Sequence, residues 1–296
     1  MTDRAQPSPL KALQYRIEAG LLSSIIFLFR LIPVDIASSF MGFCWRTFAP
    51  FNSRHKRAIA HLKKAYPDKS DADLQAIVRG MWENLGRVSA ETFYIDKLLK
   101  DGRRFEAIAD EGTQKILDEK LPCLFVSLHS GNWELTVQPA VRMGITIAGV
   151  YQALKNPSAE KILKDTRLHL YKGGLHSKSA KTPRLLRNAL DEGGVVAMMG
   201  DLRERRGVEV NFFGQPAFAT PAPASLARAA DVPIVVGRVI RKNGTQFTIQ
   251  GRMLNVTKTD DRKADIARIT QDIHDVFEEW VREHPDQWMW IHRKWD

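Results

Sequence analysis

The pattern that most restricts the fold begins at residue 105, where short apolar runs start to alternate with segments of helical spacing. Such alternation is typical of a sheet whose strands are joined by helices that cover its faces. We therefore predict the α/β class, with a mixed, mostly parallel central sheet flanked by helices. The expected strands cover residues 121–128, 145–151, 195–199, 208–213, 233–241 and 245–251. Helices are expected from residue 133 and over 157–171, 183–191, 221–230 and 262–283.

The N-terminal part of the chain is strongly apolar. Its apolar run from Ala19 is interrupted at Arg30 and Pro33 and then continues to Phe48. A membrane-spanning helix needs about 20 consecutive apolar residues, and this uninterrupted run is shorter. We predict two apolar helices, broken at Pro33, that lie in or dip into one leaflet between basic flanks suited to anionic headgroups. The alternative is a hairpin that packs its apolar face on the rest of the protein.

Two domains follow from these patterns. Residues 1–50 are the predicted N-terminal apolar membrane-associating segment, and residues 51–296 are the predicted α/β domain. Within the second, residues 52–66 and 71–100 have helical spacing and are interpreted as scaffold. The tail over 284–296 holds three tryptophans among basic residues, which suits a lipid interface or the closing of a core equally well.

The charge balance indicates the kind of partner. The chain has 44 Lys and Arg against 34 Asp and Glu, a net charge of +10, which favours anionic lipid, an acidic protein or nucleic acid. The positive charge is scattered and no nucleic-acid motif is present, so nucleic acid is not expected. Cys44 and Cys123 lie in apolar surroundings and are interpreted as core residues. No His/Cys cluster has zinc-ligand spacing, so no metal is predicted.

One stretch carries residues suited to catalysis. The apolar run over 121–128 is followed by His129, a Ser-Gly-Asn turn and Glu134. Histidine is the side chain best suited to general-base catalysis near neutral pH, and a carboxylate that accepts its other ring N–H can orient it. Gly131 and Asn132 permit a turn that would bring Glu134 to the ring. The alternative is a buried structural histidine and a glutamate that answers a helix dipole.

A covalent enzyme intermediate is not expected. Ser130 is adjacent to His129 but lacks a Gly-x-Ser-x-Gly elbow, and Ser127 is expected to be buried in the strand. The base is therefore predicted to act on a hydroxyl of the substrate.

His129-x-x-x-x-Glu134 after an apolar strand resembles the catalytic motif of the glycerolipid acyltransferase superfamily. Within that superfamily, the chain is similar to the lipid A biosynthesis acyltransferases that transfer lauroyl and myristoyl groups. Further blocks stand in the same order, although Leu202-Arg203 replaces a more polar pair in relatives. These blocks are residues 150–157, Arg167, Gly200-Asp201, residues 208–214, residues 220–227 and residues 285–293.

The resemblance implies acyl transfer at the cytoplasmic face of the inner membrane, with the protein peripheral or held by a single N-terminal anchor. His129 would deprotonate a hydroxyl of a lipid A precursor, and the oxygen would attack the thioester of acyl-carrier protein or acyl-CoA. Glu134 would orient His129, and Arg167 would bind an acceptor phosphate or steady the oxyanion. An already activated thioester requires no cofactor.

The remaining predicted site residues bind substrate. Asp201 is expected to organise the site, unless it only caps a turn. Asn132, Tyr151 and Lys155 are expected to line the site. Arg203 begins a basic loop, with two more arginines, that contacts lipid phosphates or an acidic carrier protein, or is a solvated charge run. Two alternatives remain: a lysophospholipid or other glycolipid acceptor, and a non-enzymatic protein that binds anionic lipid or nucleic acid.

Overall fold

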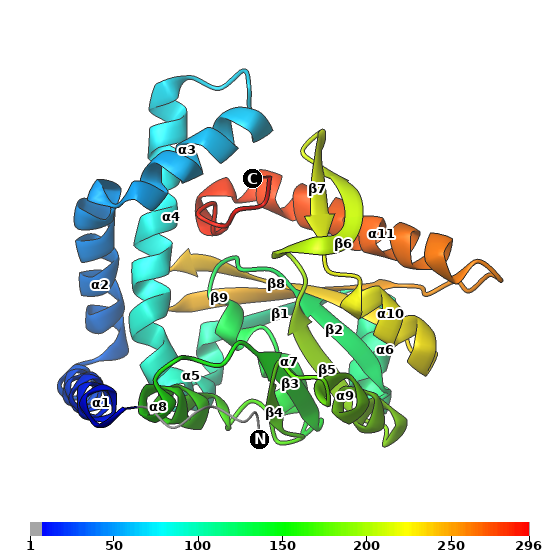
Figure 1. Ribbon diagram of the computed structural model, residues 1–296, viewed down its shortest axis with the longest axis horizontal. Coiled ribbons are helices and arrows are strands. Elements are labelled where there is room, and N and C mark those ends of the chain that lie inside the picture. The colour runs from blue at the N-terminus through cyan, green and yellow to red at the C-terminus, as the bar shows by residue number, and fades with distance from the viewer. Residues whose placement is uncertain (1–7, 296) are drawn as a thin grey trace.

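The computed structural model describes residues 8–295. Its centre is a seven-stranded sheet in the order β1-β9-β8-β2-β5-β3-β4 (Figure 1). Every neighbouring pair is parallel except β8 and β9, so the predicted mixed, mostly parallel α/β fold is confirmed. The strands are β1 (Phe105–Ala109), β2 (Cys123–Ser127), β3 (Ile147–Tyr151), β4 (Leu175–Ser177), β5 (Val195–Met199), β8 (Ile234–Asn243) and β9 (Gln246–Leu254).

β2 lies in the middle of this sheet, and this position explains why its residues are uniformly apolar. It pairs in parallel with β8 on one side and β5 on the other. A strand covered on both faces needs apolar side chains at successive positions, which is the pattern of the run before His129. Two sheet strands, β1 and β4, were not predicted. β4 has three residues and β1 exposes three of its five, so neither carries a clear apolar pattern.

The run predicted as strand 208–213 lies outside the central sheet. It belongs to an antiparallel hairpin of β6 (Arg203–Phe212) and β7 (Gln215–Ala219). Phe213 and Gly214 form its turn with φ of 57° and 69°. Two successive positive φ values return the chain directly on itself, so this strand pairs with the next one rather than with the sheet.

Helices cover the sheet, as expected, but three of them are shorter than predicted. The helix expected over 157–171 ends at Arg167. Residues 71–100 form two α-helices separated by a 3₁₀ turn, and the helix expected from residue 133 is a 3₁₀ turn followed by a short α-helix. The α-helices after the N-terminal pair are α3 (Ser53–Ala65), α4 (Asp71–Glu91), α5 (Ile95–Lys100), α6 (Glu111–Glu119), α7 (Gln138–Arg142), α8 (Pro157–Arg167), α9 (Thr182–Asp191), α10 (Ala222–Ala230) and α11 (Arg262–Glu283). The 3₁₀ turns are η1 (Ala49–Phe51), η2 (Thr92–Tyr94), η3 (Gly102–Arg104), η4 (Trp133–Leu135) and η5 (Pro285–Gln287).

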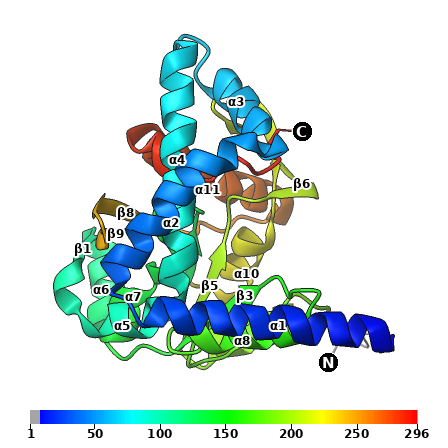
Figure 2. The same ribbon diagram turned by 90° about the vertical axis from the view of Figure 1, so that its left-hand side faces the viewer.

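The predicted break at Pro33 separates α1 (Pro9–Arg30) from α2 (Val34–Phe48). Figure 2 shows α1 lying across the base of the molecule beside α8, with α2 rising at an angle across α4. Arg30, at the end of α1, forms a bidentate ion pair with Asp96, with hydrogen bonds of 2.7 and 3.0 Å. Of the helices in residues 8–295, α1 alone has the length and composition of a membrane span. The division of the chain at residue 50 stays a prediction.

The C-terminal tail folds back into the core. Trp288 and Trp290 are buried among aromatic and aliphatic side chains that include Phe212 and Phe213. Of the two roles open for these tryptophans, core closure is therefore the observed one. Figure 1 shows the tail passing between α4 and the β6–β7 hairpin, above the carboxyl ends of the central strands.

Candidate active site

Two neighbouring parallel strands end at the same edge of the sheet and carry the central pair of residues. Ser127 at the end of β2 lies opposite Met199 at the end of β5. Just beyond, the Gly200 N–H donates to the Ser127 carbonyl at 2.8 Å, and a Cβ on Gly200 would lie 2.6 Å from Val126 Cγ1. The glycine lets the two strand ends stay close. His129 and Asp201, 72 residues apart in sequence, are thereby placed side by side.

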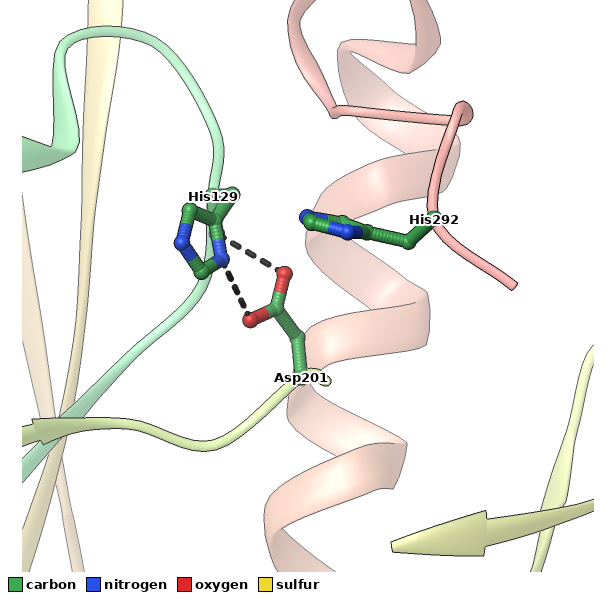
Figure 3. A group of neighbouring side chains, drawn as sticks. All are labelled: His129, Asp201 and His292. Atoms are coloured by element: carbon green, nitrogen blue, oxygen red, sulfur yellow. Dashed lines mark hydrogen bonds and ion pairs between the residues drawn. The ribbon is translucent and has the colours of Figure 1, made fainter. Parts of the chain in front are cut away.

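Asp201 holds His129 through two hydrogen bonds (Figure 3). The His129 ring Nδ1 lies 2.8 Å from Asp201 Oδ1, and the His129 backbone N–H donates to Oδ2 at 2.9 Å. The Trp288 indole N–H donates to the same Oδ2, also at 2.9 Å. Burial alone would raise the pKa of the Asp201 carboxyl, but the charge and N–H groups of His129 hold it well below its usual range. The ionised carboxylate selects the Nδ1–H tautomer, which leaves Nε2 as the proton acceptor.

Glu134 does not reach the His129 ring. Its carboxylate is held by the Arg167 guanidinium, with Nε to Oε2 at 2.8 Å and Nη2 to Oε1 at 2.5 Å. Among the residues that the structure describes, no hydrogen bond joins Glu134 to His129. The prediction that Glu134 orients His129 is therefore wrong. The η4 turn presents Glu134 to the last residue of α8, and Asp201 occupies the orienting position instead.

Arg167 forms an ion pair with Glu134, and its predicted contact with an acceptor phosphate or the oxyanion stays a prediction. Its side chain is one-quarter exposed, and that of Glu134 is nearly buried. Burial opposes the charged form, but Glu134 outweighs it and raises the pKa of Arg167 above its ordinary value. Bidentate pairing of this kind holds the guanidinium and the carboxylate in one plane.

Asn132 does not line the site, contrary to prediction. Its side chain is fully buried and donates to Glu91 Oε2 at 2.7 Å. Glu91 is itself paired with Arg241 by bonds of 2.6 and 2.9 Å. Asn132 thus connects the turn after His129 to Glu91 at the end of α4 and, through Glu91, to Arg241 of β8.

Two cavities meet at this edge. A cavity of about 340 Å³ is lined by His129, by four basic residues (Lys164, Arg167, Lys178 and Arg203) and by three acidic ones (Glu134, Glu160 and Glu204). An apolar cavity of about 770 Å³ extends between α2 and α4. Both cavities are lined by Trp133, Glu134, Leu163 and Arg167. His129 therefore lies beside the place where the two cavities meet.

Of the other predicted lining residues, two line the cavity beside His129 and one lies at the surface. Tyr151 lines the cavity and donates to Glu160 Oε1 at 2.6 Å. Arg203 also lines it, at the start of the hairpin. Lys155 is exposed and stands outside the residues that line either cavity.

A second histidine, His292, completes a three-residue cluster that resembles a metal site in composition. Ligand atoms of His129, Asp201 and His292 lie within 4.8 Å of one another. The Asp201 oxygens, however, already accept three N–H donors. Burial lowers the pKa of His292 to about 4, so this ring is neutral near pH 7. The arrangement is that of a hydrogen-bonded His–Asp pair with a neutral histidine behind it.

The family model described as bacterial lipid A biosynthesis acyltransferase matches residues 8–296. The chain belongs to this acyltransferase family. Curated relatives of the chain include phosphatidylinositol mannoside acyltransferases of two Mycobacterium tuberculosis strains, each 29% identical over 171 residues. That alignment covers 56% of this chain and 52% of each relative, so the chain spans about half the length of the curated relatives it matches.

A solved structure with a lower degree of likeness is PlsC, the 1-acyl-sn-glycerophosphate acyltransferase of Thermotoga maritima. Its TM-score is 0.35 at 12% sequence identity, over 80% of this chain and 99% of that one.

In this member of the lipid A biosynthesis acyltransferase family, the C-terminal tail reaches the site in a way that the sequence analysis missed. Trp288 contacts Asp201 directly, and the His292 ring lies 5.0 Å from the His129 ring. In the sequence, residues 285–293 match only one block of the family resemblance. Spacing could not place them at the site, because more than 150 residues separate them from His129.

Proposed function

We propose that this protein transfers a fatty acyl chain from the thioester of acyl-carrier protein to a hydroxyl of a lipid A precursor at the cytoplasmic face of the inner membrane. The observation that carries the proposal is the His129–Asp201 pair beside the junction of a largely apolar cavity and a second cavity that holds four basic and three acidic side chains. An acyl donor needs an apolar channel for its chain, and a phosphorylated glycolipid needs cations. The family match supports the class of reaction.

The reaction begins with proton transfer to His129. Nε2 takes the acceptor hydroxyl proton as the oxygen attacks the thioester carbonyl carbon, and a tetrahedral intermediate forms. Asp201 stabilises the resulting imidazolium through Nδ1. Collapse of the intermediate breaks the C–S bond, and the departing sulfur takes the proton from Nε2. The products are the ester and a free thiol, and His129 returns to its starting state.

Substrate positions follow from the chemistry of the two cavities. The acyl chain lies between α2 and α4, against the side chains of Met41, Phe48 and Leu85. The phosphorylated acceptor lies against Lys164, Lys178 and Arg203. The Glu134–Arg167 pair stands where the cavities meet and positions the reacting groups. We assign it this role because Arg167 is already neutralised by Glu134.

Membrane contact is proposed through α1 and α2. Both helices expose large apolar side chains, among them Phe27, Ile36, Phe40, Phe43 and Phe48. The same α2 forms one wall of the apolar cavity, so a lipid leaving the bilayer has a short path to the site. The expected measurement is co-flotation with anionic vesicles, weakened by the double change Phe40→Asp and Phe43→Asp. Equal flotation of both proteins would contradict contact through α2.

A second acceptor class has a specific observation in its favour. The curated relatives that align with over half of this chain are named as phosphatidylinositol mannoside acyltransferases. A glycophospholipid acceptor, like a lysophospholipid, would use the same His–Asp chemistry and the same basic side chains of the cavity beside His129. The lipid A precursor and these alternative acceptors are therefore compared in the same assay.

The test is acyl transfer by the detergent-solubilised protein, with labelled acyl-carrier protein or acyl-CoA as donor. A lipid A precursor, a lysophospholipid and a phosphatidylinositol mannoside serve as acceptors, and products are identified by mass spectrometry. We expect transfer to the lipid A precursor and a loss of about 10²–10⁴-fold with His129→Ala. His169→Ala, at an exposed histidine, is the matched control. Full activity of His129→Ala would exclude the base role, and transfer to another acceptor alone would reassign the substrate.

A further inference from the structure

The C-terminal segment, residues 284–295, supports the turn that carries His129. Trp288 forms an isolated antiparallel bridge with Ser130. The Met289 N–H donates to the His129 carbonyl at 3.0 Å, and the Gly131 N–H donates to the Gln287 carbonyl at 3.1 Å. The backbone on either side of the histidine is therefore tied to a segment that arrives from the other end of the chain.

The same segment reaches Asp201 at two places. The Trp288 indole N–H donates to Oδ2 at 2.9 Å, and the Lys294 ammonium donates to the Asp201 backbone carbonyl at 2.9 Å. Lys294 also lies 2.9 Å from His274 Nε2, on α11. Both partners of the His–Asp pair are thus contacted by one segment, and Trp288 and Lys294 are each about 1% exposed.

The indole has a specific effect on the carboxylate. The terminal torsion of an aspartate is broad, so the plane of the carboxylate is set by its hydrogen-bond donors. Oδ1 accepts from the His129 ring, while Oδ2 accepts from the His129 backbone and from Trp288. The indole is the donor on Oδ2 that comes from outside His129 itself. Without it, both bonds that set the carboxylate plane come from the residue that the carboxylate must orient.

We propose that Trp288 is a positioning residue for acyl transfer, whose indole N–H fixes the Asp201 carboxylate and through it the His129 ring. This inference rests on the base role assigned to His129 under the proposed function. Loss of the indole N–H is expected to lower kcat on the order of 10-fold and to leave KM nearly unchanged, because substrate contacts are not altered.

Trp290 supplies a matched control within the same segment. It is fully buried, as Trp288 is, and its indole N–H also makes one hydrogen bond, to the Pro285 carbonyl at 2.6 Å. Trp288→Phe and Trp290→Phe therefore remove the same atoms from the same core. The two variants differ in the acceptor that loses its hydrogen bond. Trp288→Phe removes the bond to the Asp201 carboxylate, and Trp290→Phe removes the bond to the Pro285 carbonyl.

The experiment compares kcat, KM and a spectroscopic signature in the two variants. The signature is the downfield proton resonance of His129 Nδ1–H, assigned by its loss in Asp201→Asn. Trp288→Phe is expected to move this resonance and to lower kcat, whereas Trp290→Phe leaves the resonance in place. To exclude a folding defect, Trp288 is also replaced by benzothienylalanine, which keeps the ring volume and lacks the N–H.

Three outcomes would overturn the inference: an unchanged resonance after loss of the indole N–H, equal effects of both phenylalanine variants, or full kcat with benzothienylalanine at position 288. The resonance is measured without substrate. A protein that acylates none of the tested acceptors would therefore contradict the proposed function while the positioning of His129 by Trp288 is still tested.

Discussion

At the scale of single residues, three carboxylates surround the turn after β2, and each has a different task. Asp201 accepts from the His129 ring, Glu134 pairs with Arg167, and Glu91 pairs with Arg241. The carboxylate nearest to His129 in sequence, Glu134, is not the one on its ring. Direction of the side chain, rather than sequence spacing, decides which carboxylate can orient the base.

This division of roles predicts unequal effects of two isosteric changes. Asp201→Asn presents an amide NH₂ to N–H donors and removes the charge that stabilises the imidazolium. We expect kcat to fall on the order of 10³-fold. Glu134→Gln leaves the His–Asp pair intact, and we expect a decrease of about 10-fold or less, with a rise in KM. Steady-state kinetics with a saturating acyl donor measure both, and a larger loss in Glu134→Gln would return the orienting role to that residue.

At the scale of elements, the turn from His129 to Trp133 depends on one glycine. Gly131 has φ of +56°, and a Cβ there would collide with the Val239 carbonyl oxygen of β8. The turn packs against β8 at Gly131, and the hydrogen bond from Asn132 to Glu91 ties it to α4. Tight packing on two sides lets a short segment without regular secondary structure hold the His129 side chain in place.

Gly131→Ala and Gly144→Ala separate backbone strain from this close packing. Gly144 also has a positive φ, of +74°, but a Cβ there would have nothing within 4 Å. We expect Gly144→Ala to cost about 1–2 kcal/mol of unfolding free energy with normal activity. Gly131→Ala should cost more and also lower kcat, because the turn must move away from β8. Urea unfolding and kinetics decide this, and equal losses in both variants would show that packing against Val239 is unimportant.

At the scale of the whole molecule, buried titratable groups of the C-terminal region link stability to pH. Burial lowers the pKa of His274 to about 3 and that of His292 to about 4. In the unfolded chain, both rings take up protons near their ordinary pKa of about 6.5. Between pH 6.5 and about 4 the unfolded state therefore binds more protons than the folded state, so stability falls as pH falls.

The expected size of this effect is about 2 kcal/mol for each histidine at pH 5, relative to pH 7.5. Urea unfolding at the two pH values measures it. His274→Gln and His292→Gln should each reduce the difference, although His274→Gln also loses its bond to Lys294. A difference that is unchanged in both variants would place the acid sensitivity elsewhere in the molecule.

Several features could be predicted from local sequence because local chemistry determines them. The apolar run before His129 predicted a buried strand, and alternation from residue 105 predicted the sheet. Pro33 marked the break between the first two helices, since proline cannot continue a helix interior. The weak edge strands β1 and β4 were missed because they carry little apolar pattern.

The stretch from Leu121 to Glu134 shows where local sequence stops being informative. By itself, the sequence determined that a histidine follows a buried strand and that a glycine-containing turn comes next. Only the tertiary structure decided that Asp201 reaches the ring, that Glu134 faces Arg167, and that Trp288 supports the pair. The physical reason is that the strand order places β5 beside β2, and the C-terminal segment then packs against the ends of both strands. Contacts between residues 72 or more positions apart are therefore set by topology.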